Sequence, residues 1–118
     1  MAAKDELGRR GEDIAVAFLV HGGYDILGRN WRCPQGEIDV IARDGADTVF
    51  VEVKTRSGTG FGHPLEAITA QKLARLRRLA GAWCDVNPGH GRQIRIDAIA
   101  VVATTGTVPV VDHLKRVF

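Results

Sequence analysis

The sequence predicts an α/β fold in which a mixed sheet is flanked by helices, and residues 1–118 fit a single domain. Three observations support this prediction. A helical pattern opens the chain, alternating apolar residues typical of a β-hairpin occupy its centre, and a second helical pattern precedes a further strand. The expected order is helix, three strands, helix and one or two strands, an αβββαβ core.

The first helix is expected over residues 5–20. Its apolar side chains recur at the spacing of one helical face, and they are Leu7, Ile14, Ala15, Phe18 and Leu19. The pair Gly22-Gly23 ends this helix, because glycine readily adopts the backbone conformation that closes a helix. Residues 24–31 are expected to form the first strand, and the turn sequence Cys33-Pro34-Gln35-Gly36 follows it.

The central hairpin is expected to pair residues 37–43 with residues 48–54 through a turn at residues 44–47. On each strand, apolar residues alternate with polar ones. The apolar set is Ile38 and Val40 on one strand and Val49, Val51 and Val53 on the other.

The rest of the chain predicts a second helix and two more strands. A glycine-rich loop at residues 57–62 is expected to be mobile, and a helix over residues 65–84 follows it. The turn-forming residues 87–91 end that helix. Residues 93–102 are expected to form a strand, and residues 108–112 a short fifth one.

Composition favours a cytoplasmic globular protein. The formal net charge is +2 and the pI about 8.8, which permits nucleic-acid binding without requiring it. Apolar runs are too short to span a bilayer, and polar residues occupy the place of a signal sequence. The two cysteines are expected to be reduced thiols, and all four histidines to lie at the surface. His63 stands out because it adjoins the glycine-rich loop.

The register of the hairpin brings like charges together. If the turn is centred between its second and third residues, paired residue numbers sum to 91, so Asp39 lies opposite Glu52 and Glu37 opposite Lys54. Opposed carboxylates on a sheet have Cβ atoms about 5 Å apart and repel each other. A raised pKa, a neighbouring Lys or Arg, or a divalent cation could offset this repulsion.

The third alternative leads to chemistry. Mg²⁺ binds one or two carboxylates and keeps open positions for phosphate oxygens, and a metal held in this way can activate water. Lys54, on the face of Glu52, could orient that water and stabilise developing charge. The competing interpretation is a hairpin at the edge of the sheet with a solvated face. On that face, a Glu37–Lys54 ion pair and Arg43 would neutralise the negative charge of the carboxylates.

Three further features bear on this choice. Glu12 flanks the apolar stripe of the first helix, beside small residues that would let another element come close. Lys72 projects near the middle of the apolar stripe of the second helix, so it either extends to solvent or meets a phosphate or Glu52. A basic band could contact a phosphate backbone or form a solvated helix face, and it comprises Arg75, Arg77 and Arg78 together with Arg56.

The segments Gly36-Glu37-Ile38-Asp39-Val40-Ile41-Ala42 and Phe50-Val51-Glu52-Val53-Lys54-Thr55-Arg56 carry a resemblance to the restriction-endonuclease-like PD-(D/E)XK nuclease superfamily. More narrowly, the chain resembles the YraN-like family of uncharacterised bacterial proteins. That match runs from Gly8-Arg9-Arg10-Gly11-Glu12 through Gly28-Arg29-Asn30-Trp31-Arg32 and Lys72 to Arg95-Ile96-Asp97, and it covers nearly the whole chain. Ile38 stands where the superfamily pattern has proline.

The resemblance implies a restriction-endonuclease-like core and a site with assigned roles. Mg²⁺ or Mn²⁺ would be held by Asp39, Glu52 and Glu12, and Lys54 would be the catalytic lysine beside Asp39 and Glu52. Archaeal Holliday-junction resolvases are similar in length and in this set of four residues. They act as dimers, so by analogy this chain could form a homodimer.

Two hypotheses from different classes follow from the sequence. The first is a metal-dependent endonuclease that hydrolyses phosphodiester bonds in DNA, with branched or damaged DNA among its possible substrates. Its nucleic-acid-binding residues would be Arg56, Lys72, Arg75 and Arg78. The second is a non-catalytic accessory protein that binds nucleic acid and keeps the nuclease fold. A purely structural interaction module would explain the hairpin but not the placement of Glu12 and Lys72.

Overall fold

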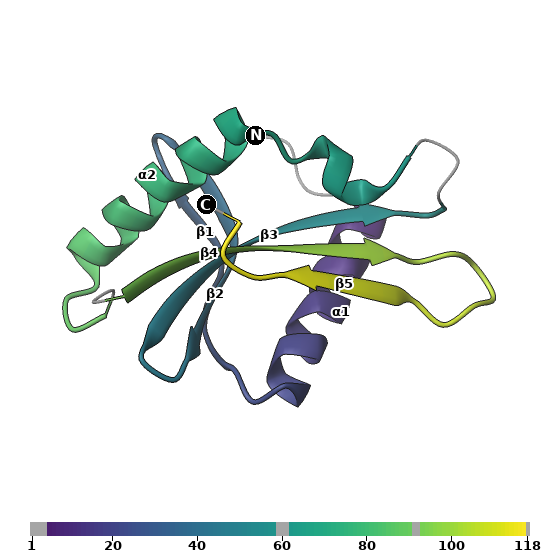
Figure 1. Ribbon diagram of the computed structural model, residues 1–118, viewed down its shortest axis with the longest axis horizontal. Helices are drawn as coiled ribbons and strands as arrows, with labels where there is room; N and C mark the ends of the chain where they lie inside the picture. The colour runs from purple at the N-terminus through teal and green to yellow at the C-terminus, as the bar shows by residue number, and fades with distance from the viewer. Residues whose placement is uncertain (1–4, 59–61, 91–92, 118) are drawn as a thin grey trace.

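A computed structural model of the chain describes residues 5–58, 62–90 and 93–117. Five strands form one sheet in the order β1-β2-β3-β4-β5, and only β3 and β4 run parallel (Figure 1). The strands are β1 (Asp25–Cys33), β2 (Gly36–Asp44), β3 (Asp47–Arg56), β4 (Gln93–Val102) and β5 (Val110–Leu114). The predicted mixed sheet flanked by helices is therefore confirmed.

The two long helices cover opposite faces of the sheet. Helix α1 (Glu6–His21) buries Ala15 and Leu19 against the valine-rich face formed by β2, β3 and β4. Helix α2 (Ala70–Val86) buries Leu76 and Trp83 against the other face, where Phe50 of β3 is completely buried. In Figure 1 the two helices accordingly lie on opposite sides of the strands. The fold is a three-layer arrangement with one apolar core on each side of the sheet.

Helix α1 begins and ends close to the predicted positions. The side chain of Asp5 accepts a hydrogen bond from the backbone N–H of Gly8 at 2.6 Å, which caps the helix. At the other end, the N–H of Gly22 donates to the carbonyl of Phe18 at 3.0 Å. Both ends are therefore determined by residues that the local sequence identifies.

The central hairpin has the predicted register. Strand pairs run from Asp44↔Asp47 to Val40↔Val51, so paired residue numbers sum to 91. The turn consists of residues 45–46, and Gly45 adopts a φ of +62°, a conformation that glycine tolerates well. The hairpin is not at the edge of the sheet, however, because β1 and β4 flank it. The interpretation as an edge hairpin with a solvated face is therefore wrong.

The predicted helix over residues 65–84 is two separate helices. A short 3₁₀ helix, η1 (Pro64–Ala67), is followed by α2, which begins after Thr69. The hydroxyl of Thr69 accepts a hydrogen bond from the backbone N–H of Lys72 at 3.2 Å and so caps α2. Lys72 consequently lies in the first turn of α2 and is exposed, not in the middle of an apolar stripe.

Strand β4 has the predicted bounds, and β5 is shifted by two residues from residues 108–112. The centre of the glycine-rich loop, residues 59–61, lies outside the described residues, so its expected mobility stays a prediction. Both cysteines are partly buried free thiols, as expected. No helix among residues 5–58, 62–90 and 93–117 is long and apolar enough to cross a membrane.

A buried ionic cluster, which the sequence did not predict, attaches the C-terminal residues to the sheet. Asp97 of β4 is completely buried and accepts hydrogen bonds from Arg95 and from the backbone N–H of Arg116. Nε2 of His113 lies 2.7 Å from the same carboxylate, and the His113 side chain is only 8% exposed. The expectation that all four histidines lie at the surface is therefore wrong for His113.

Candidate metal centre

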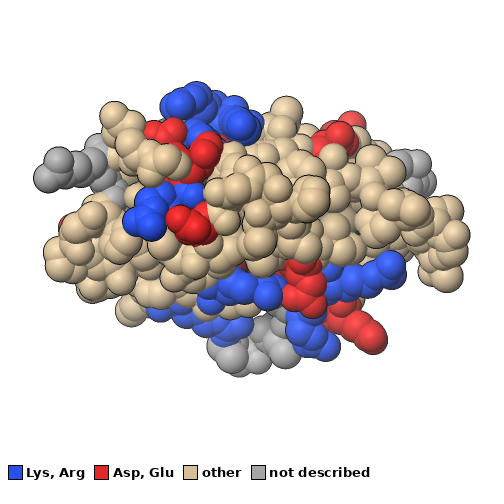
Figure 2. Space-filling model, turned by 90° about the horizontal axis from the view of Figure 1, so that it is seen from below, with Lys and Arg blue, Asp and Glu red and all other residues tan. Residues whose placement is uncertain are grey.

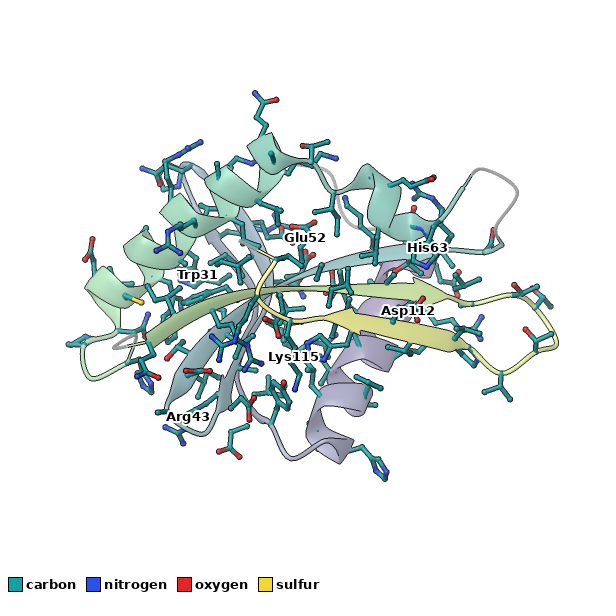
Figure 3. All side chains as sticks on the ribbon, viewed as in Figure 1. Trp31, Arg43, Glu52, His63, Asp112 and Lys115 are labelled. Atoms are coloured by element: carbon teal, nitrogen blue, oxygen red, sulfur yellow. The ribbon has the colours of Figure 1, made fainter. Side chains whose placement is uncertain are left out.

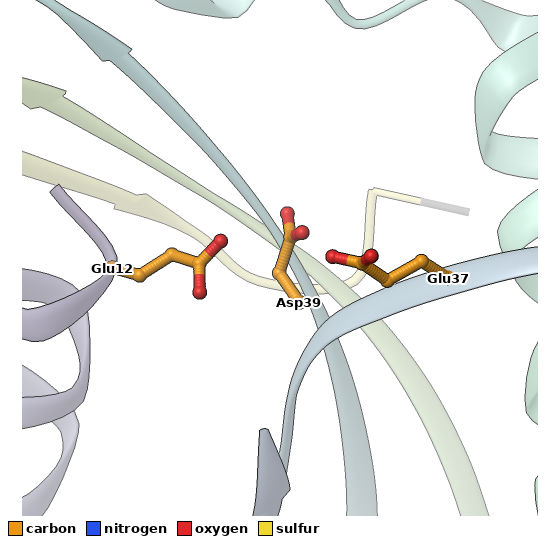
Figure 4. Close-up of side chains that lie close together, drawn as sticks. All are labelled: Glu12, Glu37 and Asp39. Atoms are coloured by element: carbon orange, nitrogen blue, oxygen red, sulfur yellow. The ribbon is translucent and has the colours of Figure 1, made fainter. Parts of the chain in front are cut away.

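Three carboxylates meet where α1 approaches β2. Glu12, Glu37 and Asp39 each place an oxygen within 4.8 Å of the oxygens offered by the other two. In Figure 4 the Glu12 side chain extends from α1 and the Glu37 side chain from β2 toward Asp39, which lies between them. We call these three side chains the carboxylate cluster. It brings together two predicted site residues, Glu12 and Asp39, with one that sequence reasoning did not assign to the metal, Glu37.

Glu12 reaches the cluster because α1 comes very close to β3. Gly11 faces Thr55 so closely that a Cβ atom added to Gly11 would overlap the threonine side chain. Only glycine allows this approach, and it places the next residue, Glu12, over the end of the sheet. Glu12 is 4% exposed and belongs to the buried side chains of the helix.

Asp39 lies where β2 separates from β3. The pairing of these strands ends at Val40↔Val51, one position before Asp39 would face Glu52. An oxygen of the Asp39 side chain then accepts a hydrogen bond from the backbone N–H of Val53 at 2.9 Å. This bond satisfies a backbone donor that the strand pairing no longer uses, and it fixes the carboxylate at the point of separation.

Glu37 pairs with a cation from the neighbouring strand. Its Oε2 lies 2.8 Å from Nε of Arg32, its pairing partner on β1. The sequence had placed Glu37 opposite Lys54, but Nζ of Lys54 forms its ion pair with Oε1 of Glu52 at 3.6 Å. The two-residue spacing of Glu37 and Asp39 was the available sign that both carboxylates could share one site.

Glu52, Lys54 and Arg56 lie in the same pocket but not in the carboxylate cluster. The pocket has a volume of about 380 Å³, and its walls also include Glu12 and Asp39. Glu52 lies on β3, below the beginning of α2 in Figure 3. The structure therefore brings all four predicted site residues to one pocket, while the three closest carboxylates are a different set.

The donor atoms fit a hard divalent cation. All three are carboxylate oxygens, the ligands that Mg²⁺ and Mn²⁺ prefer. They come from a helix and from a strand inside the sheet, so the framework that holds them is rigid. The pocket of about 380 Å³ beside Glu12 and Asp39 leaves room for water and for a substrate oxygen. The residues present can thus hold a metal ion, and Glu12, Glu37 and Asp39 would do so.

The predicted basic residues separate into two places. Arg56 lines the pocket that also contains Glu12 and Asp39. Lys72, Arg75 and Arg78 line a second hollow at the beginning of α2. Nζ of Lys72 donates a hydrogen bond to the carbonyl of Ala67, at the end of η1, at 3.0 Å.

Basic and acidic side chains lie together on the face of the molecule seen in Figure 2. Mixed groups lie at the upper left and along the lower edge, a smaller acidic group lies at the upper right, and uncharged residues occupy the area between them. Among the residues drawn in colour, this view has no continuous positive surface of the kind that follows a phosphate backbone.

His63 links the segment before η1 to the edge strand β5. Its Nε2 lies 2.9 Å from Oδ2 of Asp112, and its Nδ1 accepts a hydrogen bond from the backbone N–H of Leu65 at 3.2 Å. Figure 3 shows His63 and Asp112 close together at this end of the sheet. Both ring nitrogens are therefore engaged, and His63 is at the surface as predicted.

Comparison with known proteins gives one consistent family. Residues 11–101 match the family described as Uncharacterised protein family UPF0102. The chain is 55% identical over 117 residues to a UPF0102 protein of Leifsonia xyli and 52% identical over 117 residues to one of Beutenbergia cavernae, with 99% of both chains covered in each comparison. A UPF0102 protein of Nocardia farcinica is 53% identical over 115 residues, which cover 98% of this chain and 91% of the relative. These matches confirm the resemblance to the YraN-like proteins, and the chain belongs to the UPF0102 family.

Proposed function

We propose that this protein is a metal-dependent endonuclease that hydrolyses phosphodiester bonds in DNA. The observation that carries the proposal is the carboxylate cluster, in which oxygens of Glu12, Glu37 and Asp39 lie within 4.8 Å of one another. A lysine, Lys54, lines one pocket together with Glu12 and Asp39. Three carboxylates held this close repel one another, and a bound cation is the simplest way to offset that repulsion.

A bound Mg²⁺ or Mn²⁺ would polarise a phosphoryl oxygen and lower the pKa of a water molecule. The chain supplies the positions of the reacting groups. Asp39, fixed by the N–H of Val53, would hold the centre of the site, and Glu12 would close it from the side of α1. Lys54, paired with Glu52 at 3.6 Å, would hold the attacking water and stabilise the charge that develops on phosphate oxygens.

The positive side chains support a polyanionic substrate. Arg56 stands in the pocket itself, and the hollow lined by Lys72, Arg75 and Arg78 would contact the phosphate backbone away from the site of cleavage. These contacts are made to phosphates and carry no base sequence, so DNA shape would decide which substrate is bound. Branched and damaged DNA therefore belong among the substrates to be tested.

Metal binding is tested by calorimetric titration of Mn²⁺ into the wild type, Asp39→Asn and Asp13→Asn. Asp13 is the matched control because its carboxylate lies on α1 next to Glu12 but is 69% exposed and paired with Arg29. We expect the wild type and Asp13→Asn to bind Mn²⁺ and Asp39→Asn to bind it much more weakly. Absence of binding by the wild type, with and without DNA, would refute the proposal.

Turnover is tested with labelled duplex, single-stranded, flap and four-way DNA in the presence of Mn²⁺. We expect the wild type to cleave at least one of these and Lys54→Ala to lose the activity while retaining Mn²⁺ binding. Cleavage that is equal in Lys54→Ala and the wild type would identify a contaminating nuclease. DNA binding without any cleavage would favour the accessory protein.

By analogy with the archaeal resolvases, two copies of the chain would act together as a homodimer. Sedimentation velocity of the purified chain measures its oligomeric state.

A further inference from the structure

Glu37 contacts two groups of opposite charge, the other carboxylates of the cluster and Arg32. Its carboxylate is part of the carboxylate cluster, and its Oε2 also lies 2.8 Å from Nε of Arg32. The two residues are direct neighbours in the β1–β2 pairing, so the ion pair is set by the sheet and not by a flexible loop. The same acidic group therefore belongs to the candidate metal centre and to an ion pair at its border.

The charges favour an exchange between these partners. In the absence of a metal, Arg32 offsets part of the repulsion among Glu12, Glu37 and Asp39. A divalent cation bound by the three carboxylates brings two positive charges, and it then repels the guanidinium. Arg32 is 37% exposed on β1, which is an edge strand, so its side chain has room to turn outward.

An arginine released at this place would meet the substrate. Guanidinium groups bind phosphate through two parallel hydrogen bonds. Arg32 lies 2.8 Å from Glu37, one of the three residues that would hold the metal, so its guanidinium is close to any phosphate bound there. The pair with Glu37 is a contact of the metal-free state, and the pair with phosphate would be a contact of the loaded state.

We propose that Arg32 is a substrate-binding residue that leaves Glu37 when a divalent cation binds and then holds a phosphate of the nucleic acid. This inference rests on the proposed metal-dependent function. It makes metal and nucleic acid bind cooperatively, because the cation frees the group that the phosphate needs. It also predicts that Arg32 competes with the cation when nucleic acid is absent.

The competition is tested by titrating Mn²⁺ into the wild type, Arg32→Gln and Arg29→Gln without DNA. Arg29 is the matched control, since it is also 37% exposed on β1 but pairs with Asp13, outside the cluster. Loss of one partly exposed ion pair should tighten Mn²⁺ binding by Arg32→Gln roughly two- to fivefold, and Arg29→Gln should resemble the wild type. A purely structural role for Arg32 would leave Mn²⁺ binding unchanged or weaken it, and either result would overturn the inference.

The release of Arg32 is tested by fluorescence anisotropy of a labelled DNA duplex, in Ca²⁺ and in EDTA. Ca²⁺ takes the same oxygen ligands. The wild type and Arg29→Gln should bind DNA more tightly in Ca²⁺ than in EDTA. In Arg32→Gln this increase in DNA affinity should be smaller by roughly tenfold, as expected for a lost charge-assisted hydrogen bond to phosphate. An undiminished gain in Arg32→Gln would overturn the inference while leaving the metal site intact. Failure of the wild type to bind Mn²⁺ would instead refute the proposed function.

Discussion

Asp97 gives the sharpest prediction about stability, because one buried carboxylate holds two parts of the chain together. It is completely buried on β4 and accepts hydrogen bonds from Nε and Nη2 of Arg95, each at 3.0 Å. It also contacts Nε2 of His113 on β5 at 2.7 Å and accepts from the N–H of Arg116 at 3.1 Å. We predict that Asp97→Asn, which keeps the shape and removes the charge, destabilises the protein strongly.

The magnitude follows from what remains around Arg95. Breaking a buried ion pair by removing one partner costs about 3–5 kcal/mol. The Arg95 side chain is 4% exposed, and its Nη1 still meets Asp44 at 2.9 Å and Asp47 at 3.2 Å, so its charge is not left without a partner. We therefore expect the lower end of the range, about 3 kcal/mol. For a domain of this size that corresponds to a fall in melting temperature of roughly 10–15 °C.

Thermal and urea unfolding, followed by circular dichroism, measure this loss. The matched control is Asp112→Asn, because Asp112 also faces a histidine but is 52% exposed, so its ion pair should contribute about 0–1 kcal/mol. A loss below about 1 kcal/mol for Asp97→Asn, equal to that of the control, would refute the view that the buried network anchors the C-terminal residues.

The same substitution should change the response to acid. Burial raises the pKa of Asp97, but the hydrogen bonds from His113, Arg95 and the Arg116 backbone outweigh it, so this pKa lies below its ordinary value. An Asp whose pKa is lower in the folded than in the unfolded state contributes stability that is present above about pH 4 and is lost as pH falls through the folded-state pKa. Unfolding free energies measured at decreasing pH should therefore fall less steeply below about pH 4 in Asp97→Asn than in the wild type.

Three further predictions concern the site and its supports. In Gly11→Ala the new methyl group overlaps Thr55, so the free energy of unfolding, measured by thermal unfolding, should fall by roughly 1–3 kcal/mol. Calorimetry should show weaker Mn²⁺ binding by the same variant. Adding Thr55→Ala should restore part of the stability and part of the Mn²⁺ binding. Thr69→Ala removes the cap of α2 and should cost about 1 kcal/mol in thermal unfolding, whereas a residue in the middle of a continuous helix would lose nothing. The double variant Arg75→Gln/Arg78→Gln should reduce the slope of log DNA affinity against log salt by about 2 if both contact phosphates, with Mn²⁺ binding unchanged.

The hairpin shows how much of this fold local sequence determines. The residues around Gly45 favour a two-residue turn, and such a turn fixes the register of both strands. Because that register is short-range information, it could be predicted correctly. The same holds for the end of α1 at Gly22 and for the order of the elements along the chain.

The beginning of α2 shows where periodicity misleads. Apolar residues continue in helical spacing from Leu65 and Ile68 into α2, so the pattern looks like one helix. Thr69, a residue suited to capping, interrupts it, and the chain turns there. The error moved Lys72 from the exposed first turn to a supposed apolar face.

Contacts between distant residues could not be predicted from local patterns. Arg95 pairs with Asp44, which lies 51 residues earlier, and with Tyr24, which lies 71 residues earlier. The only local sign was an arginine and an aspartate two positions apart in a strand that is apolar from Ile94 onward apart from these two, where neither charge is stable without partners. Glu37 was missed as a cluster member for a related reason, since its place depends on how β1 and β2 run beside α1.

The separation of β2 from β3 explains why the site can exist at all. Side chains alternate between the two faces of the sheet along β3, so Glu52 and Lys54 lie on the same face as Phe50, the face that α2 covers. Glu12 comes from α1, which covers the other face. An unbroken sheet would keep these side chains apart. Because the strand pairing ends at Val40↔Val51, Asp39 can approach Glu12 and still accept a hydrogen bond from the backbone of β3. Side chains from both faces of the sheet therefore line one pocket. The early end of this pairing is therefore the structural condition for joining the carboxylate cluster to Lys54.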